Sequence, residues 1–130
     1  MLFRSALYCV AALGLLLFGL GPVISALRGR SGQFIGHETD PTNGLHKWVR
    51  AHGNTAEYAP FLAILILWLG AHNPAPWVVW TMIAATAARY IHVAGMVIPK
   101  TMNKPNLLRF VGAAGTYGTG FMLCWALLSK

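Results

Sequence analysis

Long apolar stretches alternate with short polar ones along the whole chain of 130 residues. The apolar stretches cover about 5–27, 45–69, 77–98 and 107–128. Each is close to the roughly 20 residues that an α-helix needs to cross the hydrocarbon core of a bilayer. Prolines and Gly/Asn clusters mark the breaks between them. The pattern predicts an all-α integral membrane protein, with residues 1–130 forming one domain of four transmembrane helices.

The composition agrees with a chain that is solvated by lipid. Hydrophobic residues make up 56% of the sequence and charged residues only 10%, whereas a soluble domain carries about 25% charged residues. The net charge of +7 raises the question of a nucleic-acid partner. The Lys and Arg residues are scattered at the ends of the apolar stretches, without a basic run or a nucleic-acid motif. We therefore expect contact with the lipid bilayer and no nucleic-acid partner.

The distribution of basic residues predicts the orientation in the membrane. Four spans place both termini on one side, and the first and third connections on the other. Cytoplasmic connections carry the excess of Lys and Arg. The side of the first and third connections carries five basic residues: Arg28, Arg30, Lys47, Lys100 and Lys104. The side of the termini carries two, Arg4 and Lys130. We expect cytoplasmic first and third loops, non-cytoplasmic termini, and a multi-pass location in a bacterial cell (inner) membrane.

A row of polar residues opens the second apolar stretch. At about 100° per residue, Arg50, Asn54 and Glu57 fall within one narrow stripe of a helix. Ionisable groups inside a membrane cost roughly 2.5–3.5 kcal/mol each on insertion scales, and they usually mark function. Arg50 and Glu57 are about 10 Å apart along the axis, which is long for a direct ion pair. The stripe suits an elongated zwitterion such as a small peptide, because the guanidinium matches a carboxylate and the carboxylate accepts from an ammonium group. Tyr58, on the neighbouring face, adds a hydroxyl.

Two other interpretations of these residues stay open. The polar groups can instead form a structural network with Arg89 of the third stretch, which either closes a ligand site or only neutralises Glu57. Glu57 can also be the proton or cation site of a small four-helix transporter, although the fixed cation of Arg50 would then compete with the cargo. No metal site is expected, because the five histidines show no i, i+4 pair and no HExxH spacing.

The stretch Arg50–Pro60 resembles the second helix of the MAPEG family, the membrane-associated proteins of eicosanoid and glutathione metabolism. The shared pattern is Arg-Ala-(His/Gln)-x-Asn-x-x-Glu-(Tyr/Asn)-x-Pro. Weaker similarities extend over nearly the whole chain. Val23–Arg28 is similar to the end of the first helix in leukotriene C synthase. Similarity to microsomal glutathione transferase is seen in Arg89–His92, and in Lys104–Asn106 followed by Phe110–Gly112.

The resemblance implies a homotrimer of four-helix subunits that binds glutathione as a co-substrate between neighbours, near the cytoplasmic face. It implies no metal, and a lipophilic small molecule as the second substrate, as in detoxification. By position, the glutathione contacts implied by the family are Arg28, Arg50, Asn54, Glu57, Tyr58 and Tyr90. Arg89 joins them as a residue that can close the site from a second helix.

One departure from the family bears on catalysis. Catalytic members place an arginine immediately after the Pro-Asn pair, where it stabilises the thiolate. Here Leu107 follows Asn106, and the nearest arginine is Arg109, about 200° further round the helix. We therefore expect a glutathione transferase, with or without peroxidase activity, in which Arg109 is the catalytic residue and Arg28 and Arg89 are weaker candidates. The alternative is a non-catalytic protein of the same family that binds lipid or glutathione.

Overall fold

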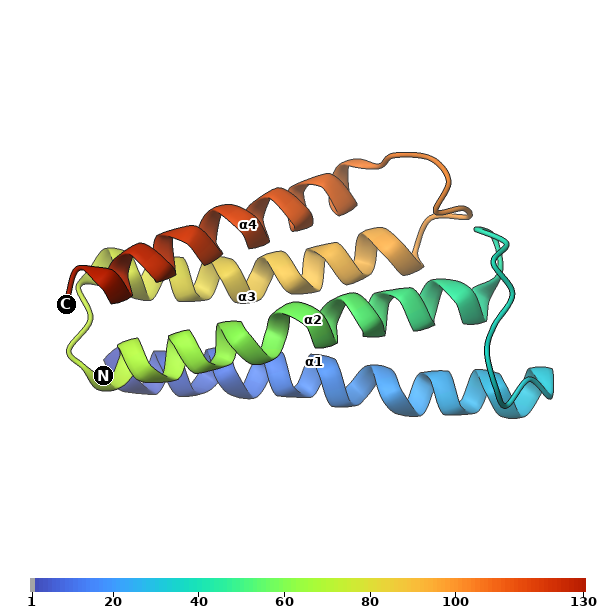
Figure 1. Cartoon of the computed structure of the whole chain (residues 1–130), viewed down its shortest axis with the longest axis horizontal. Coiled ribbons are helices and arrows are strands. Elements are labelled where there is room, and N and C mark those ends of the chain that lie inside the picture. The colour runs from blue at the N-terminus through green and yellow to red at the C-terminus, as the bar shows by residue number, and fades with distance from the viewer. Residues whose placement is uncertain (1) are drawn as a thin grey trace.

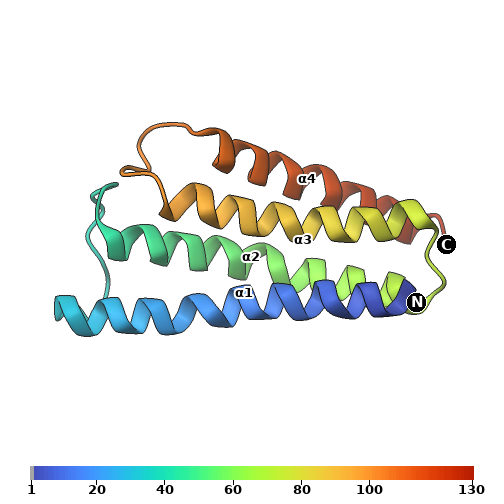
Figure 2. The ribbon, with the colours of Figure 1, turned by 180° about the vertical axis from the view of Figure 1, so that it is seen from behind.

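The computed structural model describes residues 2–130 as four helices that run alternately up and down. They are α1 (Leu2–Ser31), α2 (Gly44–Ala71), α3 (Pro76–Val97) and α4 (Leu107–Leu128). Both termini lie at one end of the bundle beside the short α2–α3 connection, and the other two connections lie at the opposite end (Figures 1 and 2). The prediction of an all-α four-helix protein is confirmed.

The first helix is longer than its apolar stretch. We predicted that it would end near residue 27, but α1 continues to Ser31. Arg28 and Arg30 therefore lie in its last turn, where cations interact favourably with the partial negative charge of the helix C-terminus. The helix ends at Gly32, whose backbone φ of +69° is accessible to glycine at little cost. The amide of Gly32 donates a hydrogen bond of 2.9 Å to the Arg28 carbonyl oxygen.

The ends of the other three helices agree with the sequence to within two residues. The Asn43 side chain caps α2 by accepting a hydrogen bond of 2.9 Å from the amide of His46. Asn106 caps α4 in the same way, accepting from the amide of Arg109 at 2.9 Å. Pro76 opens α3, where its missing N–H leaves no hydrogen bond unmade. Asparagine caps and a proline at the first position are common helix-start signals.

Three of the four helices are long and apolar enough to cross a membrane, judged by their length and composition. They are α1 over Phe3–Ser31, α2 and α4. Large apolar side chains such as Leu15, Phe18 and Phe61 are exposed on the outside of the bundle, as expected where lipid is the solvent. The chain is a multi-pass integral membrane protein. The helix α3, which carries Arg89 and His92, is not among the three candidate spans.

The helices α3 and α4 pack most extensively, and their contact depends on glycine. A Cβ atom on Gly112 of α4 would overlap the backbone of His92, and one on Gly95 of α3 would overlap the backbone of Arg109. Small residues allow this close approach of helix backbones. Gly112, Thr116 and Gly120 are spaced four residues apart and form a row of small residues along one face of α4. The Gly112-xxx-Thr116 part of this small-residue row packs against α3. Its third member, Gly120, has open space around its Cβ position.

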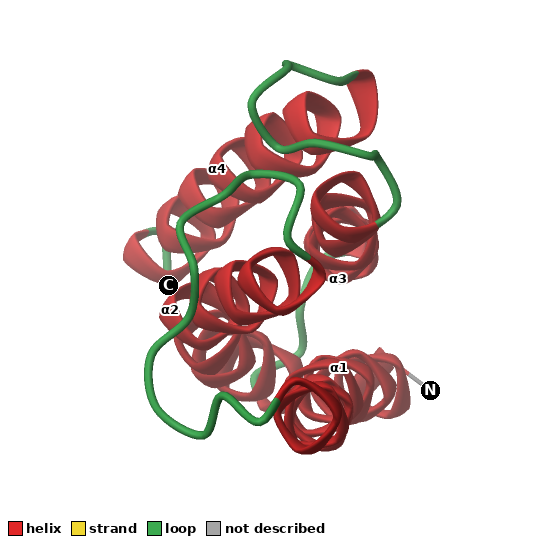
Figure 3. Cartoon of the chain, turned by 90° about the vertical axis from the view of Figure 1, so that its right-hand side faces the viewer, coloured by secondary structure: helices red, strands yellow, loops and turns green. Residues whose placement is uncertain are grey.

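The helices α2 and α4 contact each other less than any other contacting pair. Viewed from the end that carries the first and third connections, α4 lies beside α3 and is set apart from α1 (Figure 3). The pair α1 and α2 and the pair α3 and α4 are thus two tight hairpins, joined mainly by contacts of α3 with α1 and α2. This arrangement leaves the facing sides of α2 and α4 only partly covered.

The interior has two apolar cores with a polar layer between them. One core, nearer the termini, takes a fully buried side chain from each helix: Leu13, Ile66, Met82 and Leu123. The other core, nearer the first and third connections, includes Leu20, Ala51, Val93 and Met96. Buried polar side chains lie between the two cores along α2, α3 and α4: Thr55, Arg89 and Thr116. Polar side chains in the middle of a membrane bundle need hydrogen-bond partners within the protein, and these partners determine how the helices pack.

The close contact of α3 and α4 makes a prediction about stability. Gly112→Ala should destabilise the protein by about 1–3 kcal/mol, because the new methyl group meets the His92 backbone and not a movable side chain. Gly118→Ala is the matched control in the same helix, since nothing lies within 4 Å of its Cβ position. It should be neutral, or stabilising by up to about 1 kcal/mol through helix propensity. Thermal unfolding in detergent measures both, and equal melting temperatures would contradict the packing described.

Candidate functional site

Arg89 lies at the centre of the polar layer and joins three helices. Its side chain is 1% exposed. One guanidinium nitrogen donates a hydrogen bond of 2.6 Å to Asn54 Oδ1 of α2, and the other donates one of 3.3 Å to Thr116 Oγ1 of α4. The guanidinium carbon also lies 5.3 Å from the centre of the Tyr58 ring, within the range of a cation–π interaction. A single buried cation thus organises α2, α3 and α4.

The bonds of Arg89 are made to neutral groups. Within the described part of the chain, its Nε atom is buried and has no hydrogen-bond partner. A buried donor without a partner costs about 1–3 kcal/mol, and a buried cation is stabilised by a nearby anion. The sequence left open whether Arg89 closes a ligand site or only neutralises Glu57. A direct ion pair of Arg89 with Glu57 is not seen, because the hydrogen bonds of Arg89 go to an amide and a hydroxyl.

The stripe on α2 is divided by this network. Arg50 and Glu57 are exposed, whereas Asn54 and Tyr58 are half-buried. The oxygen of Asn54 is bound to Arg89, which leaves the NH2 group as the donor that Asn54 can offer to a ligand. The charged members of the stripe are thus presented outward, while the neutral members are held from behind.

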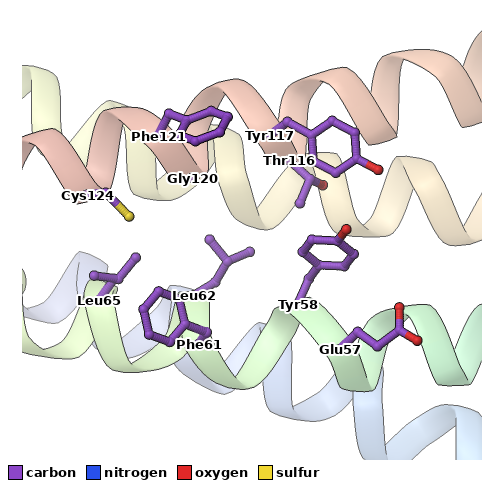
Figure 4. Close-up of a pocket in the computed structure, with 10 residues that line it drawn as sticks. All are labelled: Glu57, Tyr58, Phe61, Leu62, Leu65, Thr116, Tyr117, Gly120, Phe121 and Cys124. Atoms are coloured by element: carbon purple, nitrogen blue, oxygen red, sulfur yellow. The ribbon is translucent and has the colours of Figure 1, made fainter.

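A groove of about 340 Å³ lies between α2 and α4, next to the stripe (Figure 4). One end is polar and is lined by Glu57, Tyr58 and Tyr117. The two tyrosine rings face each other across the groove, with centroids 5.8 Å apart and planes tilted by 52°. The remainder of the groove is apolar, with Phe61 on the α2 side and Phe121 on the α4 side. Its volume is within the usual range of small-molecule sites.

Two of the expected glutathione contacts have hydrogen-bond partners elsewhere in the chain. The Arg28 guanidinium donates to the carbonyl oxygens of Gln33 at 2.9 Å and Gly36 at 2.7 Å, and so holds the start of the first connection. The Tyr90 hydroxyl donates to the Ala12 carbonyl oxygen of α1 at 2.7 Å. The structure of the single chain therefore brings Asn54, Tyr58 and Arg89 of the expected set into contact, but not Arg28 or Tyr90.

Arg109, the expected catalytic residue, is bound to the third connection. Its guanidinium donates a hydrogen bond of 2.7 Å to the Met102 carbonyl oxygen. Its own carbonyl oxygen lies 3.2 Å from His92 Nδ1. Arg109 is half-buried and does not line the α2–α4 groove. Within one chain its charge is therefore not adjacent to the polar end of that groove.

The first and third connections are tied together at one end of the bundle. The amide of Met102 donates to the Pro41 carbonyl oxygen at 2.9 Å. Lys47 donates to the carbonyl oxygen of Pro99 at 2.8 Å.

In the first connection, Asp40 accepts from the amide and the hydroxyl of Thr42 at 2.8 and 2.7 Å. These two hydrogen bonds lower the pKa of the Asp40 carboxyl below its usual value, and the bond from the Thr42 amide has the larger effect. The turn is therefore stabilised above the ordinary aspartate pKa, and this contribution is lost as the carboxyl becomes protonated at lower pH.

The sequence analysis did not identify the α4 residues that face the stripe. Thr116 is a member of the small-residue row of α4, and its hydroxyl accepts a hydrogen bond from the buried Arg89. The spacing of that row could have identified it as a partner for Arg89. Nothing in the sequence indicated Tyr117, because its place opposite Tyr58 depends on the distance between α2 and α4.

A comparison with protein families matches residues 6–129 to the MAPEG family, which is nearly the full length of the chain. The chain belongs to the MAPEG family. This confirms the resemblance carried by Arg50–Pro60. No curated protein and no solved structure matches the chain significantly. MAPEG proteins are membrane proteins that typically use glutathione. Within residues 2–130, no group of three or more His, Cys, Asp or Glu side chains is placed to hold a metal ion.

The Arg89–Asn54 contact makes a second prediction. Asn54→Ala should destabilise the protein by about 1–3 kcal/mol, because it leaves another buried donor of Arg89 without a partner. In an Arg89→Met background the same change should cost little, giving a coupling energy of about 0.5–3 kcal/mol. The matched control pairs Asn54→Ala with Arg50→Met, an exposed arginine one turn away, and should give additive losses. Unfolding in detergent measures the cycle, and additivity with Arg89→Met would show that the contact contributes nothing.

Proposed function

We propose that this MAPEG protein is a glutathione-binding membrane transferase that conjugates or reduces lipophilic electrophiles. The observation that carries the proposal is the α2 stripe, in which the exposed charges of Arg50 and Glu57 flank an amide held by Arg89. Glutathione has two carboxylates and one ammonium group. A guanidinium binds a carboxylate with two parallel hydrogen bonds, and the Glu57 carboxylate accepts from the ammonium group. The residues present therefore fit this ligand.

The proposed active form is a homotrimer with glutathione between neighbouring subunits. In a single chain, Arg28 and Tyr90 have hydrogen-bond partners away from the stripe. In the proposed trimer, they would contact a glutathione molecule bound between subunits. The stripe begins near the end of the bundle that carries the first and third connections. We place that end on the cytoplasmic side, where the excess of Lys and Arg belongs, and the termini on the other side.

The proposed reaction begins with ionisation of the glutathione thiol, whose proton passes to water. The thiolate sulfur then attacks an electrophilic carbon, a carbon–sulfur bond forms, and the leaving group departs with its bonding electron pair. Reduction of a hydroperoxide would consume two glutathione molecules and give the disulfide, an alcohol and water. A nearby cation favours the thiolate in a partly desolvated site. Arg109 remains the proposed catalytic cation, with Arg28 and Arg89 as further candidates.

A second candidate function is non-catalytic binding of lipid or glutathione. It is favoured by the surroundings of Arg109, whose guanidinium is hydrogen-bonded to the Met102 carbonyl oxygen and does not line the groove. Leu107 stands where catalytic family members have an arginine. The stripe would then hold its ligand without activating a thiol. A measurement of glutathione binding together with one of turnover distinguishes the two candidates.

Binding is tested by the melting temperature of the purified protein. Millimolar glutathione should raise it, because a ligand that binds only the native state stabilises that state by linkage. Arg50→Ala should abolish the shift, since it removes the guanidinium proposed to hold a carboxylate. Arg4→Ala removes an exposed arginine near the terminus of α1 and should keep the full shift. If glutathione leaves the melting temperature of the unmodified protein unchanged, the stripe does not bind it.

Catalysis is tested with chlorodinitrobenzene as the electrophile. The unmodified protein should form the conjugate and release chloride. Arg109→Ala should lower kcat by about 100-fold, as removal of one preorganised charge-stabilising group does in other enzymes. The same variant should keep its glutathione-induced rise in melting temperature. Binding without conjugation or peroxide reduction, across several electrophiles, would favour the non-catalytic candidate.

A further inference from the structure

The first connection begins with a tight turn that is held by Arg28. The turn spans residues 32–36, and a glycine with positive φ stands at each of its ends, Gly32 at +69° and Gly36 at +66°. The Arg28 guanidinium donates to the carbonyl oxygens of Gln33 at 2.9 Å and Gly36 at 2.7 Å. Both hydrogen bonds come from Nη1, which leaves Nη2 and Nε as further donors. The 32–36 turn is therefore a defined element of the connection.

Two exposed apolar side chains stand at the centre of the 32–36 turn. Phe34 is 74% exposed and Ile35 is 91% exposed. Exposed apolar side chains on the helices are explained by the lipid around them, but Phe34 and Ile35 lie in a connection, where polar residues are expected. Contiguous apolar surface with polar surroundings marks a place of contact with a partner or a membrane. These two side chains therefore need a cover.

The 32–36 turn lies beside the last turn of α1 and not beyond it. Arg28 precedes the end of α1 at Ser31 by about one helical turn, yet its side chain reaches Gly36. The first connection accordingly rises toward α2 from beside the last turns of α1 (Figures 1 and 2). With 30 residues, α1 is about 45 Å long, which matches a bilayer with both of its headgroup regions, about 40–45 Å. The 32–36 turn is therefore at the level of the lipid headgroups.

The end of the bundle that carries this turn is positively charged. The first and third connections and the adjoining helix turns carry two carboxylates, Glu38 and Asp40, against six cations: Arg28, Arg30, Lys47, Lys100, Lys104 and Arg109. Arg30 is exposed and lines the same cavity as Gln33 of the turn. Cations next to exposed apolar side chains are typical of segments that lie in an anionic membrane surface. The cations are attracted to lipid phosphates, while the apolar side chains enter the acyl boundary.

A second copy of the chain fits this surface less well than lipid does. A stable protein interface buries about 1,200–2,000 Å² in total, and a large aromatic side chain supplies only about 150–250 Å². Phe34 and Ile35 together are far below that size. A lipid surface needs no minimum area here, because the helices already hold the chain in the bilayer.

We propose that the 32–36 turn is a membrane anchor on the side of the first and third connections. Phe34 and Ile35 insert between the headgroups and the upper acyl chains, and Arg30 binds the phosphate of an anionic phospholipid. Arg28 holds the turn in the conformation that presents both apolar side chains to the lipid. The anchor does not depend on the glutathione-binding function, and it fixes the start of the first connection at the membrane surface.

The first test measures the surroundings of Ile35 in nanodiscs of phosphatidylcholine and phosphatidylglycerol. Bimane is attached to Ile35→Cys in a Cys9→Ala/Cys124→Ala background, which removes both native cysteines. Lipids with a nitroxide on the upper acyl chain should quench this label, and iodide in the water should not. Thr39→Cys is the matched control with the opposite pattern, because Thr39 is exposed in the same connection but outside the turn. Adding Phe34→Ser should raise iodide quenching of the Ile35 label toward that of the Thr39 label.

The second test measures the preference for anionic lipid. At equal mole fraction, nitroxide-labelled phosphatidylglycerol should quench the Ile35 label more than nitroxide-labelled phosphatidylcholine. Arg30→Gln should remove most of this difference, and high salt should weaken it by screening. Arg4→Gln, at the opposite end of α1, is the control and should keep the difference.

Three results would contradict the proposal. An Ile35 label as accessible to iodide as the Thr39 label would place the turn in water. A label that is protected from iodide but is not quenched by nitroxide lipids would show that a neighbouring subunit covers the turn. Equal quenching by the two lipids, unchanged in Arg30→Gln, would refute the role assigned to Arg30.

Discussion

A charged guanidinium buried in the middle of a membrane bundle is the constraint around which this structure is organised. Arg89 is costly in an apolar environment, and α3 alone offers it no partner. The amide of Asn54, the hydroxyl of Thr116 and the ring of Tyr58 surround it from α2 and α4. These contacts set the register of three helices, because each partner lies between two apolar cores that would otherwise allow the helices to slide.

The same network gives the surface of α2 its chemistry. Since Arg89 holds Asn54 and packs against Tyr58, these side chains are positioned before any ligand arrives. Preorganised groups cost less to order on binding. Arg50 and Glu57, which are exposed, are the residues proposed to distinguish a zwitterion from other molecules. The polar layer thus supports the proposed ligand site from behind, while the open side of α2 and α4 provides the apolar surface beside it.

Much of the fold could be predicted from the sequence, because the bilayer allows few solutions. Apolar length predicted the four helices, and prolines and Gly/Asn clusters marked the breaks between them. The end of α1 was placed four residues too early, since Arg28 and Arg30 are polar and yet stabilise a helix C-terminus. The helical period placed the stripe on one face. It could not decide what Arg89 binds, nor bring Tyr117 opposite Tyr58, because both depend on distances between helices.

The buried cation also bears on how the protein is made. The helix α3 carries Arg89, whose guanidinium makes its hydrogen bonds to side chains of α2 and α4. Insertion of α3 during synthesis should therefore be delayed until α4 has emerged from the ribosome. The bundle would then assemble from a waiting α1–α2 hairpin and an α3–α4 hairpin that joins it as a unit, since α3 and α4 share the closest contact.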